Sequence, residues 1–254
     1  MTEAEGGLEK DRKIVIFIPE PNSNLVKYLF SSLLILSLVT AKGQQQAAAP
    51  IKQSVPTVSV NDFITEAMQK GGADLHQQLA IWMPTYFWGL VAKQMQIPDE
   101  TLQMITNEVG NYMMFLVVDY TMVPGGSTMT FMSEDDLRKS IKLVDASKTI
   151  SLPLSSDKIT GTTQTMIDAM LPVFQKLFGQ FGAGMHIFLF DGKGTNGKPL
   201  YDPTLPGSFS LIWEDAHLKW NLPFNCMMPV KYCPVDHEKM QGNWSYCPIH
   251  GVKL

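Results

Sequence analysis

The sequence predicts an α+β domain, in which a mostly antiparallel sheet packs against two long helices, followed by a small C-terminal hairpin. Some segments carry apolar residues at helical spacing. Others are rich in β-branched and aromatic residues and are separated by turns with glycine or proline. With 254 residues, 45% of them hydrophobic, the chain can form one substantial core and an appendage. We expect the α+β domain at residues 59–222 and the hairpin, stabilised by a metal or a disulfide, at residues 223–254.

The N-terminal region has the pattern of an export signal. Lys27 precedes a short apolar run that ends in Ala41-Lys42-Gly43, and these small residues fit the −3 and −1 positions of a cut before Gln44. The run is shorter than the roughly 20 residues that span a bilayer. We therefore expect residues 25–43 to be a cleaved signal peptide and the product to be periplasmic or secreted, with membrane attachment only through an uncleaved signal.

Two further segments are expected to lie outside the folded domain. Residues 1–24 are charged and precede the signal, so we interpret them as a non-native extension from a misassigned start, with a genuine cytoplasmic tail as the alternative. Residues 44–58 contain Gln-Gln-Gln, Ala-Ala-Ala and prolines without a periodic apolar face, which is typical of a flexible leader.

Helical spacing of apolar residues indicates where the domain is helical. A first helix should be capped by Asn61 or Asp62 and interrupted at Gly71-Gly72. The two long helices are expected at about residues 74–95, with Trp82 on the apolar side, and at residues 163–181, with kinks at Pro84 and Pro172. Shorter helices should begin at Pro98 and after Ser133, which with Asp136 offers a capping box.

The strands are predicted from β-branched and aromatic runs. Residues 112–122 form one long, largely buried strand, and Pro124-Gly125-Gly126 turns the chain into a hairpin partner at residues 127–132. Further strands are expected at residues 141–144, 149–154, 185–190 and 209–213.

The last two dozen residues contain the spacing that points to a particular chemistry. Cys233 and Cys247 each begin the same phrase, in which Cys-Pro and one aliphatic residue precede a potential metal ligand, Asp236 or His250. Two ligands three residues apart on a tight turn can hold one side of a metal ion, and a second such turn can complete a tetrahedral site.

This tail resembles the zinc-ribbon family, whose knuckles usually read Cys-Pro-x-Cys-Gly twice. The second knuckle, Cys247 to Gly251, matches with His250 in place of the second cysteine. The first knuckle departs from the pattern with Asp236 for the second cysteine and His237 for the glycine. The resemblance covers about a tenth of the chain and implies a structural zinc held by Cys233, Cys247 and His250, with either Asp236 or His237.

A disulfide between Cys233 and Cys247 is the alternative. Closing a loop of this size would stabilise the fold by roughly 3 kcal/mol in the chain-entropy model, and an oxidising compartment favours it. The chain has three cysteines, so Cys226 is left over as a buried thiol, an alternative ligand or an intermolecular partner.

Composition and motifs exclude more functions than they indicate. The net charge of −4, without a basic cluster, argues against nucleic acid as a partner. The glycine-rich loop at residues 191–198 lacks the pattern of a phosphate cradle or a calcium loop. His76, His186 and His217 are isolated in sequence, so any catalytic triad would have to assemble in three dimensions.

We therefore expect an exported binding or structural protein with a structural zinc in its tail, and an enzyme is the less favoured class. One alternative is a periplasmic protein that handles copper or zinc, because Cys226, Met227 and Met228 offer soft ligands near Cys233. The other is a hydrolase whose site the fold assembles. The sequence indicates no partner and no oligomeric state.

Overall fold

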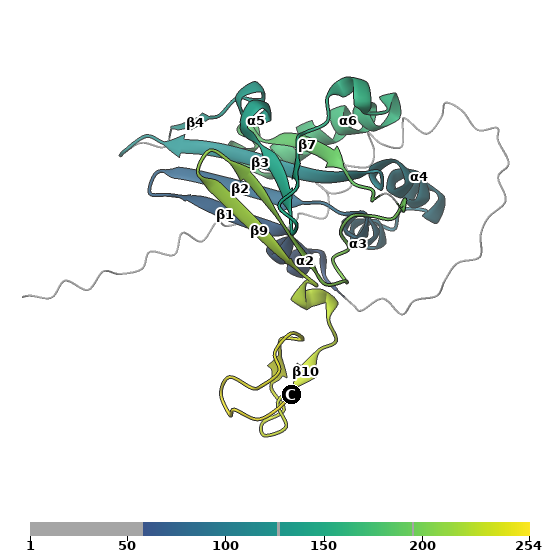
Figure 1. Cartoon of the computed structure of the whole chain (residues 1–254), viewed down its shortest axis with the longest axis vertical. Helices are drawn as coiled ribbons and strands as arrows, with labels where there is room; N and C mark the ends of the chain where they lie inside the picture. The colour runs from purple at the N-terminus through teal and green to yellow at the C-terminus, as the bar shows by residue number, and fades with distance from the viewer. Residues whose placement is uncertain (1–57, 126–127, 195) are drawn as a thin grey trace, which may run out of the picture.

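The computed structural model describes residues 58–125, 128–194 and 196–254. The expected extension and signal peptide, and all of the expected leader except its last residue, lie outside the described residues. The described chain combines helices with antiparallel sheets, which confirms the α+β class (Figure 1). Within these residues, no helix has both the length and the apolar character needed to cross a membrane.

The first sheet is built around one long strand. β3 (Tyr112–Met122) pairs with β2 (His76–Trp82) on one side, and β2 in turn pairs with β1 (Met68–Ala73). On its other side β3 pairs with β4 (Met129–Phe131) near its end and with β7 (His186–Asp191) near its start. All these pairs are antiparallel, and β3 is buried along most of its length, as its apolar composition predicted.

The second sheet contains β6 (Ile150–Ser151), β5 (Lys142–Asp145), β8 (Gly207–Trp213) and β9 (Ala216–Leu222), in that order. It lies against the first sheet, with β9 crossing β1 to β3 in Figure 1. Aromatic rings join the two sheets: Trp82 meets Phe209 edge-on at 4.9 Å between ring centroids, and Phe115 lies 5.5 Å from Trp220. β9 was not predicted as a strand.

In the part of the chain that the structure describes, five α-helices accompany the sheets. They are α2 (Val60–Ala67), α3 (Thr85–Met95), α4 (Asp99–Val109), α5 (Glu134–Ser140) and α6 (Gly161–Leu177), with 3-10 turns η1 (Ser156–Lys158), η2 (Gly179–Gly184) and η3 (Asn225–Met227). α3 packs on α4 and α4 on α6, while α5 and α6 lie above β3 and β7 in Figure 1. The Ser133 hydroxyl caps α5 by accepting from the Asp136 N–H, as predicted, whereas α2 is capped by Ser59 rather than by Asn61 or Asp62.

The prediction of a long helix at residues 74–95 is wrong in its first half. Residues 76–82 form β2, and the preceding glycines lie in β1, so the two make a hairpin with Asp74-Leu75 at its tip. Pro84 does not kink a helix but precedes the first residue of α3, a position where its missing N–H costs nothing. The apolar residues here are buried, Trp82 included, but pairing with β3 overrides their helical spacing. Within residues 58–125, 128–194 and 196–254, α6 is therefore the one long helix where two were expected.

The C-terminal tail forms a separate projection below the body of the molecule (Figure 1). It carries the short strands β10 (Lys231–Tyr232) and β11 (Lys239–Met240), which pair only with each other. Its buried residues, Cys233, Met240 and Cys247, form a hydrophobic cluster distinct from the main core. The main core itself extends past β9 to Phe224 and Met227.

Candidate metal centre

Two tight turns in the tail carry the predicted ligands. The first, residues 233–238, joins β10 to β11. The second, residues 247–252, is closed by an antiparallel bridge between Tyr246 and Lys253. Each turn therefore lies at the tip of a small hairpin, which is the arrangement that the zinc-ribbon resemblance implied.

The two turns have the same internal hydrogen bonds. The Cys233 N–H donates to the Glu238 carbonyl at 2.9 Å, and the Cys247 N–H donates to the Val252 carbonyl at 2.8 Å. In each turn the cysteine carbonyl also accepts, at 2.8 Å, the N–H of the residue four positions later. The doubled sequence phrase thus folds into a doubled backbone structure.

The residue four positions after each cysteine has a left-handed backbone conformation in both turns. Gly251 has φ 65° and His237 has φ 61°. Glycine adopts this conformation freely, whereas a residue with a Cβ does so only at a cost. His237 therefore occupies the backbone position of the knuckle glycine, and its side chain is exposed to solvent.

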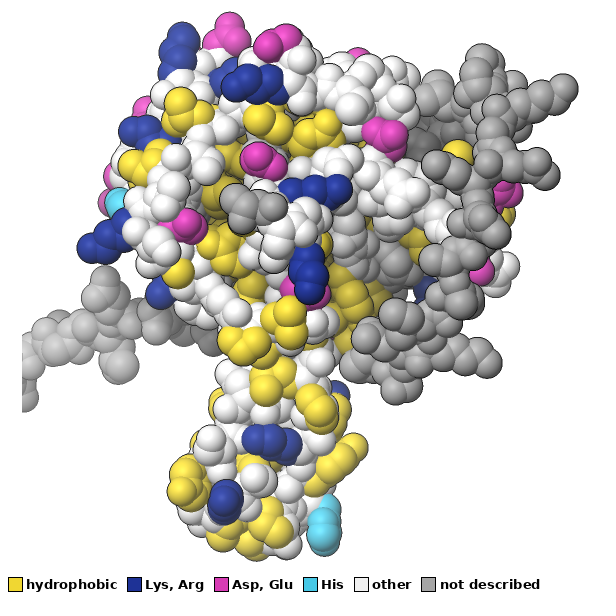
Figure 2. Space-filling model, turned by 45° about the vertical axis from the view of Figure 1, so that its right-hand side comes forward, with side chains coloured by type: hydrophobic (Ala, Val, Ile, Leu, Met, Phe, Trp, Pro, Cys, Tyr) yellow, Lys and Arg dark blue, Asp and Glu magenta, His cyan; other side chains and the backbone are white. Residues whose placement is uncertain are grey.

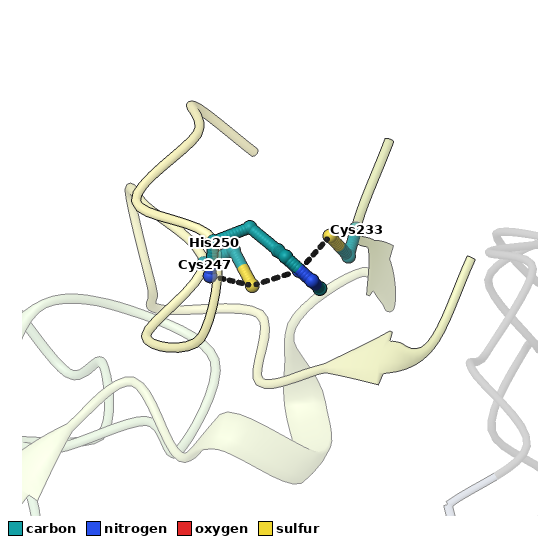
Figure 3. Close-up of side chains that lie close together, drawn as sticks. All are labelled: Cys233, Cys247 and His250. Atoms are coloured by element: carbon teal, nitrogen blue, oxygen red, sulfur yellow. Dashed lines mark hydrogen bonds between the residues drawn. The ribbon is translucent and has the colours of Figure 1, made fainter. Parts of the chain in front are cut away.

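Three side chains converge between the turns (Figure 3). His250 Nδ1 lies 3.3 Å from Cys233 Sγ and 3.6 Å from Cys247 Sγ, and both cysteines are buried. A tetrahedral metal with bonds of about 2.3 Å to sulfur and about 2.05 Å to nitrogen separates these atoms by about 3.6 Å. The group of Cys233, Cys247 and His250 could therefore hold a metal ion.

Asp236 borders this group. Its Oδ2 lies 3.6 Å from His250 Nδ1, close to the roughly 3.4 Å expected between oxygen and nitrogen ligands of one tetrahedral ion. A hydrogen bond from the Glu238 N–H to the carboxylate lowers the pKa of Asp236, although partial burial opposes this, so the group is ionised at neutral pH. Of the two open candidates for the remaining ligand, Asp236 is the one that contacts His250, although the group whose ligand atoms all lie within 4.8 Å of one another contains only Cys233, Cys247 and His250.

The thiols lie among backbone N–H groups. The His250 N–H approaches Cys247 Sγ at 3.4 Å, and the Val235 N–H approaches Cys233 Sγ at 3.5 Å. Burial acts to raise the pKa of Cys247, but the N–H groups of His250 and Ile249 outweigh it and lower that pKa. Burial raises the pKa of Cys233. All three cysteines of the chain are free in the structure, so the Cys233–Cys247 disulfide is not formed.

Cys226 takes no part in the cluster. It packs against the main core, and its N–H donates to the Glu66 carboxylate at 2.7 Å. Burial and the neighbouring negative charge of Glu66 raise the pKa of Cys226 to about 12. Met227 is buried in the same core. The soft ligands expected for copper therefore do not gather around Cys233.

A second group of possible ligands was missed by the sequence analysis. His76 Nε2 lies 2.8 Å from Asp119 Oδ1, and the carboxylate of Glu214 is close to both. The hydrogen bond to Asp119 raises the pKa of His76, although burial opposes it. His76 and Asp119 are 43 positions apart, and Glu214 comes from the other sheet, so no spacing in the sequence could have brought them together.

By its geometry, the tail presents two similar turns whose Cys233, Cys247 and His250 side chains could hold a metal ion. No family model, curated protein or solved structure matches the chain.

Proposed function

We propose that the tail binds one structural Zn²⁺ through Cys233, Cys247, His250 and Asp236, and that the chain is an exported binding or structural protein. The observation that carries this proposal is the pair of separations between His250 Nδ1 and the two thiols, which fit tetrahedral zinc without rearrangement. Four protein ligands would leave no open position on the ion, so the metal would be structural rather than catalytic.

The small size of the tail's core supports a structural ion. Three residues of the tail cluster are buried and three more pack partly against them: Trp244, Val252 and Leu254. A unit of this size buries too little apolar surface to offset its conformational entropy, so comparable units depend on a metal or disulfides. The thiols must be deprotonated to bind the ion. Lowering the pH should therefore release the metal, and with it the stability of the two turns, once protons displace the ion.

The exposed apolar side chains of the tail support a binding role. Tyr232, Val235, Tyr246 and Ile249 are between 57% and 66% exposed. Figure 2 shows hydrophobic side chains spread over the surface of this projection. A structural ion would fix the two turns and so give these side chains a rigid support. The export part of the proposal rests on the sequence pattern of residues 25–43.

The test is a metal and thiol analysis of the purified mature chain. We expect one zinc per chain by elemental analysis, with thiols at positions 233 and 247 that react only after a chelator removes the ion. The matched control is Cys226→Ser, which should keep the full zinc content. A chain without metal, whose mass shows the loss of two thiol hydrogens, would establish the disulfide and overturn the proposal.

A further inference from the structure

The buried carboxylate of Asp119 lies where the two sheets meet, and three side chains point at it. Its Oδ2 accepts from the Trp213 indole N–H at 2.8 Å and from Gln78 Nε2 at 3.1 Å. Its Oδ1 is 2.8 Å from His76 Nε2. Asp119 is only 3% exposed, so these contacts hold the carboxylate in place, with Oδ1 directed toward the partly exposed His76.

Glu214 adds a third possible ligand at the β8–β9 turn. One ligand atom each from His76, Asp119 and Glu214 lies within 4.8 Å of the others. Asp215, its neighbour in the turn, accepts from Gln78 Nε2 at 3.0 Å and so borders the same cluster. The four residues come from β2, β3 and the β8–β9 turn, and the site exists only because the sheets pack together.

The charge of this cluster is not balanced by protein cations. Three carboxylates, Asp119, Glu214 and Asp215, surround one imidazole, and in the described part of the chain no lysine or arginine makes an ion pair with them. Asp119 is buried, whereas Glu214 and Asp215 are exposed at the turn, so a cation bound at the edge of the cluster would be attracted by all three carboxylates and remain open to solvent.

Gln78 ties two of the carboxylates together, because its Nε2 donates to both Asp119 and Asp215. Its side chain is 1% exposed and points its amide into the cluster, but its Oε1 has no hydrogen-bond partner. Burying an unpaired amide oxygen costs free energy. The unpaired oxygen faces Gly71 of β1, while the nitrogen holds the two carboxylates close to each other beside His76.

We propose that His76, Asp119 and Glu214 form a second metal site, separate from the tail, that binds an oxygen-preferring divalent transition ion such as Mn²⁺. The ion would replace the proton shared by His76 and Asp119. Two ligand atoms 2.8 Å apart with bonds of about 2.1 Å subtend about 85° at the metal, which suits octahedral coordination, whereas a tetrahedral pair would lie about 3.4 Å apart. Three protein ligands leave octahedral positions for water, with His76 partly exposed to solvent.

The experiment is a Mn²⁺ titration of the zinc-loaded mature chain, followed by electron paramagnetic resonance and calorimetry. Thiolates bind Mn²⁺ weakly, so the cysteines of the tail should not compete for it. We expect one saturable site in the wild type, weakened at least tenfold by either His76→Ala or Glu214→Gln. The matched control is His217→Ala, which changes an exposed histidine of β9 outside the cluster and should leave binding unchanged.

Two further measurements distinguish loss of this site from loss of the tail site and from misfolding. His250→Ala should lower the zinc content of the tail but keep the Mn²⁺ site, so the two proposals fail independently. Glu214 lies exposed at a hairpin tip, and its substitution should preserve the circular dichroism spectrum and melting temperature of the metal-free chain. No saturable binding up to about 1 mM Mn²⁺, or equal binding in wild type and both variants, would overturn the site.

Discussion

At the scale of single residues, the two knuckle turns differ at one strained position. His237 has the left-handed φ that Gly251 adopts freely in the other turn. We expect His237→Gly to stabilise the tail by about 1 kcal/mol, which corresponds to roughly fivefold tighter zinc binding, with the stoichiometry unchanged. A competition titration with a chromophoric chelator measures this.

Substitutions of the individual candidate ligands decide which residue completes the zinc ligand set. Asp236→Ala and His250→Ala should each weaken or abolish zinc binding, because His250 lies between the two thiols and Asp236, the proposed fourth ligand, contacts His250. If His237→Gly loses the metal and Asp236→Ala keeps it, His237 is the ligand and the assignment of Asp236 is wrong.

His186 provides a pH-dependent test within the main domain. Burial lowers its pKa from the ordinary 6.5, and nearby Arg138 acts in the same direction, although Glu134 opposes them. Because the folded state binds this proton less readily than the unfolded state, the stability from His186 is complete above about pH 6.5 and is lost as the pH falls toward the lower folded pKa.

The measurement is denaturant unfolding of the wild type and His186→Gln between pH 7.5 and 5. We expect the difference in free energy of unfolding between the two proteins to shrink or reverse as the pH falls, since glutamine cannot take up a proton. An NMR titration of His186 should give a pKa below 6.5. A pKa above that value would contradict the assigned environment.

At the scale of elements, β7 shows how an edge of the first sheet is stabilised. Phe188 is fully buried in this strand, and the Arg138 guanidinium of α5 lies 5.1 Å from the centre of its ring. Phe188→Ala should cost roughly 3–5 kcal/mol in free energy of unfolding, because it leaves a cavity and removes this contact.

The control for this prediction is Leu152→Ala. Leu152 is 62% exposed, so its truncation should change stability by less than about 0.5 kcal/mol. Chemical denaturation of the two variants and the wild type provides the comparison. A cost below about 1 kcal/mol for Phe188→Ala would mean that β7 is not packed as the structure has it.

At the scale of the whole molecule, the two separate hydrophobic clusters predict independent responses to metal removal. A chelator should make residues 229–254 sensitive to protease while the cooperative melting of the main domain is unchanged, because Cys233, Met240 and Cys247 do not belong to the main core. Limited proteolysis followed by mass spectrometry locates the cuts. Melting of both parts in one transition, with and without chelator, would show that they depend on each other.

The expected export is the other prediction that concerns the whole chain. The short apolar run and the Ala-x-Gly sequence lead us to expect a mature form that begins at Gln44. Intact-mass measurement or N-terminal sequencing of the exported protein tests this. A species that retains Met1 in the membrane would contradict it.

The sequence by itself determined the features that are local along the chain. Residues 112–122 form β3 with the predicted limits, since a long β-branched and aromatic run has no polar face that a solvent-exposed helix could use. The two knuckle turns likewise follow from short phrases in which ligand and turn residues are neighbours, so the tail's group of Cys233, Cys247 and His250 could be predicted.

Tertiary structure decided everything that depends on residues distant in the chain. Residues 76–82 have apolar residues at helical spacing, yet hydrogen bonding to β3 and β1 makes them a strand, because pairing on both sides outweighs a weak local preference. β9 alternates apolar and polar residues in the sequence as it alternates buried and exposed ones in the fold, so its strand signal was overlooked, and tertiary structure decided only that its buried side covers the first sheet. For the same reason the cluster of His76, Asp119 and Glu214 was invisible in the sequence: it forms where the two sheets meet, and contact between sheets has no signature in the order of residues.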